Sequence, residues 1–162
     1  MVVVKKIPGD SDDSLIRKFS RKVMSELKRS GHNYMASVNI LIFVESRYKV
    51  NRKKIREALE VHLGEQQVGS DAEISVAIVG DRKMRELSKK YKGEDKTRNV
   101  LSFSLTEGET MKNPSNILRL GDVVISYPEV IREAAKEEVL VDEKIEELLI
   151  HGTDHLLGLH YD

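Results

Sequence analysis

The chain is defined first by what it lacks. Its 162 residues include no cysteine and no tryptophan and only three prolines, and no apolar run approaches the length of a membrane-spanning helix. Without cysteine there are no disulfide bonds and no thiolate zinc sites, so any metal must be held by nitrogen and oxygen. The first residues also lack the apolar core and small-residue cleavage site of a secretory signal peptide. We therefore expect a cytoplasmic protein that does not contact a membrane.

The chain also lacks net charge, but its charges are unevenly distributed. It carries 27 basic and 27 acidic residues. Residues 1–34 hold eight basic and four acidic residues, whereas residues 129–148 hold three basic and eight acidic residues. A basic patch suits a partner rich in phosphate, because neutralising phosphates releases counterions. Any binding of nucleic acid by this neutral chain must therefore be local.

The spacing of apolar residues predicts alternating helices and strands. Strands are expected over residues 38–44, 72–80, 100–105 and 121–127, and helices over residues 11–30, 51–63, 81–91, from 128 onward and 142–157. Asp81 is a plausible cap for the third helix, and Pro128 suits the first turn of the fourth. This order predicts an α+β fold, with a four-stranded mixed sheet packed against helices and preceded by an amphipathic N-terminal helix. A boundary near residues 30–37 would separate a basic segment, 1–34, from a domain, 35–162.

Three of the five histidines lie in the last twelve residues, HGTDHLLGLHYD. His151 and His155 are four residues apart on an expected helix, so their side chains project from the same face. Gly158 ends this helix and lets the chain bring His160 towards them. Three imidazoles would leave the fourth zinc position to water, although paired histidines also occur by chance on surface helices. Gly152 stands where HExxH proteases carry their glutamate base, so such a protease is not expected.

The same segment resembles the HGxLHLxGYDH signature of the YbeY endoribonucleases, metal-dependent RNases of rRNA maturation and ribosome quality control. Two other segments of the chain also resemble motifs of this family, and the three motifs occur in the order that the family has. RELSKKYKGEDKTRNVLSFSL (85–105) resembles the family's ELNxxYRGKDKPTDVLSFP, and LGDVVIS (120–126) resembles its GDIVIS strand. The resemblance covers about residues 38–162. It implies an α+β fold, cleavage of single-stranded RNA, and one zinc ion per chain held by His151, His155 and His160.

The chain departs from the family pattern inside the signature. The family's third ligand falls ten residues after the first, where this chain has Tyr161; His160 is one residue early, and Asp162 is an alternative oxygen ligand. Asp154 stands where the family has leucine. It borders the expected metal face, so it could accept a hydrogen bond beside the metal, act as a catalytic base, or simply be solvated.

A second departure concerns the charged loop at residues 92–98. Lys92 stands where the family has an arginine implicated in catalysis. Lysine keeps the charge but cannot grip a phosphate with two parallel hydrogen bonds, and Arg98, at a family threonine position, could supply that contact. We expect Lys92 and Arg98 to stabilise the charge that develops during phosphodiester hydrolysis. The alternative is a solvated turn.

Residues 2–23 resemble the start of small-subunit ribosomal protein S-twenty-one, most specifically in SDDSLIRKFSRKV. That resemblance implies a ribosome-addressing element fused to a nuclease domain. The alternative is a helix that packs on its own domain through Leu15, Phe19 and Val23. A short tether would raise the effective concentration of a second contact with the small ribosomal subunit.

Together these features predict a zinc-dependent, single-strand-specific endoribonuclease that acts on small-subunit rRNA. A rival of another class is a ribosome-binding factor that has lost its chemistry, since the third histidine is displaced and the family arginine is replaced. A third possibility is hydrolysis of another phosphoester at the same metal. The identity of the metal rests on the resemblance, because three imidazoles also suit copper, nickel or iron.

Overall fold

The computed structural model describes residues 2–5, 38–66, 68, 71–105 and 117–159. The expected N-terminal helix and the last three residues, His160, Tyr161 and Asp162, lie outside these ranges. The described elements are β1 (Val2–Lys5), β2 (Val38–Val44), α2 (Arg52–Glu65), β3 (Ala72–Val79), α3 (Asp81–Lys92), β4 (Val100–Ser104), β5 (Leu118–Ser126), α4 (Tyr127–Glu137) and α5 (Val141–Leu156). None of the described helices is long and apolar enough to span a bilayer.

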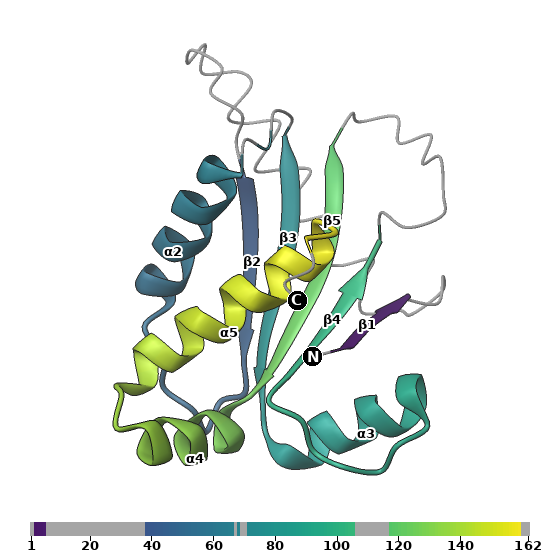
Figure 1. The fold of residues 1–162 in the computed structure, drawn as a ribbon, viewed down its shortest axis with the longest axis vertical. Coiled ribbons are helices and arrows are strands. Elements are labelled where there is room, and N and C mark those ends of the chain that lie inside the picture. Colours follow the sequence, from purple (N-terminus) through teal and green to yellow (C-terminus); the bar gives the residue numbers. More distant parts are fainter. Residues whose placement is uncertain (1, 6–37, 67, 69–70, 106–116, 160–162) are drawn as a thin grey trace.

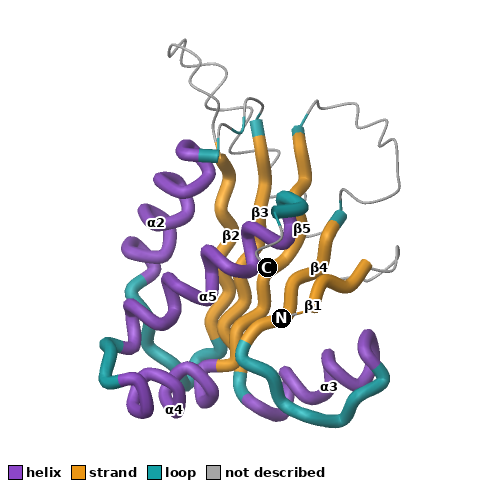
Figure 2. Tube along the Cα trace, viewed as in Figure 1, coloured by secondary structure: helices purple, strands orange, loops and turns teal. Residues whose placement is uncertain are grey.

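The strands form one mixed sheet in the order β1-β4-β5-β3-β2. Only β4 and β5 are antiparallel, and the other neighbours are parallel. The α+β class and the four predicted strands are confirmed. A fifth strand, β1, joins the edge beside β4 and runs parallel to it from Val2 to Lys5 (Figures 1 and 2). The segment predicted to be an N-terminal appendage thus contributes a strand to the sheet of the main domain.

Alternating residues of the strands separate the core into two layers. On β5, Val123 and Ile125 face the larger cluster, which contains residues of α2, α4 and α5, whereas Val124 faces a smaller cluster with Met84 of α3. Successive side chains of a strand point to opposite faces, so α3 and α5 cover opposite faces of the sheet. Figure 2 shows α5 crossing in front of the strands, with its last turns over the middle of the sheet.

The starts of α2 and α4 follow from local capping. Asn51 accepts a hydrogen bond from the Lys54 amide at the start of α2, and Ser126 accepts one from Glu129 at the start of α4, where the first-turn position of Pro128 is confirmed. The predicted cap of α3 is wrong, because Gly80 precedes that helix and Asp81 is its first residue. The carboxylate of Asp81 instead binds side chains of other elements.

Gly121 allows close contact between β4, β5 and the end of α5. Its φ is +136°, and the pairing of β5 with β3 shifts there, since Glu73 pairs with Arg119 and Ile74 pairs with Gly121. A Cβ atom at Gly121 would lie 2.0 Å from the carbonyl oxygen of Phe103 and 3.2 Å from the side chain of Leu156. Only glycine fits this bulge, and the fit brings the strand pair against the histidine-bearing turns.

Candidate active site

The last turns of α5 carry two of the predicted metal ligands. His151 is exposed and His155 is half-buried, and both lie within the helix. A separation of four residues places two imidazoles on the same side of a helix, one turn apart. The helical placement that the sequence predicted for this pair is therefore present in the structure.

Gly152 explains why the site has no glutamate at the second position of the motif. A Cβ atom there would lie 2.6 Å from Val123 Cγ1 and 3.0 Å from Ser102 Oγ. The hydroxyl of Ser102 donates a hydrogen bond of 3.1 Å to the carbonyl oxygen of Gly152. The helix backbone is thus pressed onto β4 and β5 at this point, and any side chain would push α5 away from the sheet.

Asp154 lies in the interior. It is 1% exposed, and its Oδ1 is 2.5 Å from Nε2 of His62, which is 8% exposed and belongs to the last turn of α2. Because a carboxylate can only accept, we assign the proton to the imidazole nitrogen. The solvated interpretation of Asp154 is wrong, and its burial favours a hydrogen-bonding role over direct contact with a substrate.

His62 was missed from the sequence as a residue of this region. It lies beside Ile55, Leu59 and Leu63 on the buried face of α2. A histidine on an apolar helix face signals a polar partner inside the protein, because burying an unpaired polar group is costly. That signal was available in the sequence, but it could not identify Asp154, 92 residues away, as the partner.

The end of α5 is closed by a turn at Gly158. Amides after the helix bond back to its last carbonyls, from Gly158 to His155 at 3.1 Å and from Leu159 to Asp154 at 2.8 Å. Gly158 has a φ of +74°, which suits glycine. The predicted helix stop is confirmed. Among the residues that the structure describes, no three His, Asp or Glu side chains form a metal-binding group. The predicted third ligand, His160, is the next residue after the last described one, Leu159.

Lys92 and Arg98 come from the other side of the sheet. Lys92 is the exposed last residue of α3, and α3 packs on the face opposite to α5. Arg98 donates from Nε to Ser88 Oγ at 3.3 Å and pairs with Glu94. Hydrogen bonding to Lys96, helped by the charge of Arg98, holds the pKa of Glu94 below its ordinary value. Arg98 is thus engaged with α3 and with its own loop, and neither cation is brought together with the histidines of α5.

Asp81 connects the start of α3 to the end of β5, to α4 and to the loop before β4. It accepts hydrogen bonds from Ser126 Oγ at 2.9 Å, Thr97 Oγ1 at 3.0 Å and Arg132 Nη2 at 3.0 Å. Burial would raise the pKa of Asp81, but the hydrogen bonds from Arg132, Ser126 and Thr97 outweigh it and lower that pKa. This network fixes the loop that precedes β4, and so the position of Arg98 relative to α3.

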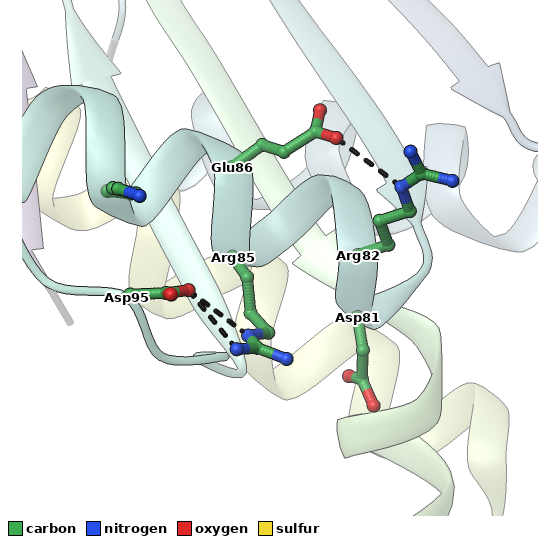
Figure 3. Close-up of a pocket in the computed structure, with 6 residues that line it drawn as sticks. Asp81, Arg82, Arg85, Glu86 and Asp95 are labelled. Atoms are coloured by element: carbon green, nitrogen blue, oxygen red, sulfur yellow. Dashed lines mark hydrogen bonds and ion pairs between the residues drawn. The ribbon is translucent and has the colours of Figure 1, made fainter.

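The pocket shown in Figure 3 lies along α3. It is lined by three acidic and three basic side chains, namely Asp81, Arg82, Arg85, Glu86, Lys89 and Asp95. Arg85 pairs with Asp95 at 3.3 Å and Arg82 pairs with Glu86 at 3.6 Å. Since the opposite charges offset one another, this pocket is not a concentrated phosphate site.

Comparison with known proteins decides the family. The family model described as Endoribonuclease YbeY matches residues 43–162, which include α5 with its histidines, the loop that carries Arg98, and the bulged strand β5. The chain belongs to the YbeY endoribonuclease family. YbeY proteins are metal-dependent endoribonucleases, so the predicted enzyme class and the resemblance of the three motifs are confirmed.

Individual YbeY proteins match along much of this chain. Endoribonuclease YbeY of Acinetobacter baylyi is 34% identical over 113 residues, which are 70% of this chain and 71% of that protein. The Geobacter sulfurreducens protein of the same name is 33% identical over 119 residues, covering 73% of this chain and 77% of that protein. A match to the Anaeromyxobacter YbeY is 41% identical over 93 residues but covers only 46% of that protein.

A solved structure is similar to this chain in its fold. The solution structure of TM1509 from Thermotoga maritima aligns with a TM-score of 0.51 and 25% sequence identity, covering 76% of this chain and 73% of that chain. The family match begins at residue 43, so the resemblance of residues 2–23 to ribosomal protein S-twenty-one stays a prediction.

Proposed function

We propose that this chain is a zinc-dependent, single-strand-specific endoribonuclease that acts on small-subunit rRNA in ribosome maturation or quality control. One observation carries the proposal. In a chain of the YbeY family, the last turns of α5 present His151 and His155 on one side of a helix that is pressed against the sheet at Gly152. A glycine turn then directs the chain towards the predicted third ligand.

The donor set of α5 fits a metal of intermediate softness. Two imidazoles one turn apart supply nitrogen ligands, and in a chain without cysteine the remaining zinc ligands are nitrogen and oxygen. We propose that His151, His155 and His160 hold one zinc ion per chain, with Asp162 as the alternative third ligand. When bound, zinc would supply Lewis-acid stabilisation of phosphate charge and would acidify a water molecule.

We propose that two cations, Lys92 at the end of α3 and Arg98 in the loop that follows it, bind phosphate groups of the RNA. Lys92 would attract the phosphate backbone as a point charge. Arg98 would contact phosphate with its guanidinium after exchanging Glu94 for the substrate, because that carboxylate now occupies it. Because α3 and α5 cover opposite faces of the sheet, both residues would bind backbone phosphates of the RNA away from the bond that is cleaved. Asp154 would not contact the RNA. Its buried carboxylate would instead hold α5 against α2 through the hydrogen bond with His62.

The test combines metal content with cleavage. Untagged protein should contain about one zinc per chain by elemental mass spectrometry, as a single three-ligand site requires. It should cut single-stranded RNA in preference to duplex RNA. The variant His155→Ala should lose both the metal and the cleavage, whereas His32→Ala, a histidine outside the motif, should retain both. Cleavage that persists in His155→Ala would point to a contaminating RNase and count against the proposal.

A second candidate is a ribosome-binding factor without catalysis. The engagement of Arg98 by Ser88 and Glu94 favours it, because that guanidinium is not held ready for a phosphate. The presence of Lys92 at the position of the family arginine also favours the ribosome-binding factor. Equal ribosome association by the unaltered chain and His155→Ala, with no metal and no cleavage in either, would support this candidate over the enzyme.

A further inference from the structure

The His62–Asp154 pair lies directly behind the proposed metal ligands. Asp154 precedes His155 and follows His151 by three residues on α5, yet its carboxylate points into the protein towards α2. The side chains of both partners are almost fully buried, at 10% exposure for His62 and 2% for Asp154. A polar contact this deep in the interior is costly to bury and needs a reason other than packing.

Two polar contacts join α2 and α5, one on the surface and one in the interior. Near the helix starts, Lys54 Nζ lies 3.5 Å from Asp142 Oδ2 on the surface. Near the helix ends, His62 meets Asp154 in the interior. Between these contacts the helices share apolar residues of the larger core cluster, including Leu59, Leu63, Ile145 and Leu149. Apolar contacts tolerate sliding and rotation, but a directional hydrogen bond of 2.5 Å tolerates little of either.

The last turns of α5 are therefore fixed from three directions. The sheet contacts the helix at Gly152, where Ser102 donates to the carbonyl oxygen. Helix α2 contacts it at Asp154 through His62. The turn at Gly158 closes its end, and the Leu159 amide donates to the carbonyl oxygen of Asp154 itself. With these three sides held, the backbone that carries the exposed His151 and the half-buried His155 is fixed.

Hydrophobic stability alone does not explain the pair. Replacing both partners of a buried polar contact by apolar residues of similar size is often neutral or stabilising, and the family signature has leucine at the position of Asp154. We propose that His62 and Asp154 are positioning residues, which fix the rotation of the last turns of α5 so that His151 and His155 face one common metal ion. This inference rests on the proposed metal site.

The test uses a variant that keeps the packing and removes the hydrogen bond. His62→Leu/Asp154→Leu leaves no buried polar group unpaired and should fold, whereas either single change would leave one partner unsatisfied. The probe is Co²⁺, which takes the nitrogen ligands of zinc and absorbs visible light according to their geometry. The control is Lys54→Gln/Asp142→Asn, which removes the surface contact between the same two helices.

The double-leucine variant should bind Co²⁺ about tenfold or more weakly, as when groups that orient metal ligands are lost. Its visible spectrum should also change, while the control should match the unaltered chain. Asp154→Asn keeps an oxygen acceptor for His62 and should keep the Co²⁺ spectrum. Unchanged Co²⁺ affinity and spectrum in the double-leucine variant would overturn the proposal, as would equal losses in Asp154→Asn and the double-leucine variant.

Hydrogen exchange separates this inference from the proposed function. The amides of Gly158 and Leu159 bond to the carbonyls of His155 and Asp154, so they report order at the end of α5. They should exchange several-fold faster in the double-leucine variant than in the control. If the unaltered chain binds no Co²⁺, the proposed metal site fails, and this exchange alone decides whether the pair orders the turn. Equal exchange in the two variants would then overturn the positioning role.

Discussion

At the scale of single residues, the candidate site depends on a glycine, Gly152, at a position where any side chain would clash. Gly152 has no Cβ, and this allows the backbone of α5 to approach Val123 and Ser102 closely enough for a hydrogen bond from the Ser102 hydroxyl. The neighbouring positions have opposite requirements, since Asp154 must be polar to meet His62 and His151 must reach solvent. Adjacent residues of the motif therefore serve packing, positioning and ligand binding separately.

Gly152→Ala tests the close approach. A Cβ atom would clash with Val123 Cγ1 at 2.6 Å, and overpacking of this kind costs about 1–3 kcal/mol of unfolding free energy. The matched control is Gly64→Ala in α2, where a Cβ atom would meet nothing within 4 Å. Alanine is the better helix former, so the control should be stabilised by up to about 1 kcal/mol. Urea unfolding of both variants measures the difference, and a Gly152→Ala chain as stable as the control would contradict the prediction.

At the scale of helices and strands, α4 and α5 are joined by a buried lysine. Lys144 of α5 is 4% exposed. Its Nζ lies 3.0 Å from Glu137 and 3.4 Å from Glu133, both on α4, and 3.2 Å from Glu147 one turn further along α5. Burial would lower the pKa of Lys144, but the hydrogen bonds to Glu137 and Glu147 and the nearby acidic charges outweigh it and raise that pKa. One cation thus offsets three acids of an acidic surface.

Lys144→Met removes this cation and keeps most of the apolar stem. We expect unfolding free energy to fall by about 1–2 kcal/mol, less than for a fully buried pair because the glutamates are partly exposed. The exposed Lys136→Met on α4 is the control and should change stability by less than about 0.5 kcal/mol. Because the folded pKa of Lys144 is raised, its contribution is complete below the unfolded pKa, near 10.5, and is lost as pH rises through the folded pKa. An equal alkaline loss of stability in Lys144→Met and the unaltered chain would contradict this assignment.

The elements that the sequence predicted correctly are those with local signals. The apolar spacing located all four strands of the main domain and the four described helices to within a few residues, and Pro128 marked the start of α4. The start of β5 was placed three residues late, at Gly121 instead of Leu118. Glycine usually interrupts a strand, but here a bulge places its positive φ inside the ladder. That bulge depends on the neighbouring strand β3 and has no local signal.

The same distinction applies to the site. The helix that carries His151 and His155, and its end at Gly158, follow from spacing and from a glycine, so they could be predicted. The contact between His62 and Asp154 depends on how α2 packs against α5, which no local pattern records. The placement of α3 and α5 on opposite faces of the sheet is likewise a property of topology.

At the scale of the whole molecule, the sheet joins the predicted ribosome-addressing segment to the nuclease domain. Strand β1 belongs to residues 1–34 and pairs with β4 over its whole length. Deleting residues 1–34 would therefore uncover the edge of β4 as well as remove the basic helix predicted from the sequence. Unpaired edge strands promote aggregation, so a deletion would confuse loss of ribosome binding with loss of solubility.

Charge substitution tests the tether without disturbing the sheet. Replacing Arg17, Lys18, Arg21 and Lys22 by glutamine removes four positive charges from the predicted helix and retains β1. If each charge neutralises one phosphate of single-stranded rRNA, the slope of log affinity against log salt concentration should fall by about 3. Co-sedimentation with small ribosomal subunits across a salt series measures this slope. The control replaces four exposed lysines of the described domain, Lys53, Lys83, Lys89 and Lys136, by glutamine. A slope that falls equally in both variants would mean that binding follows total charge, and the N-terminal segment would then have no addressing role of its own.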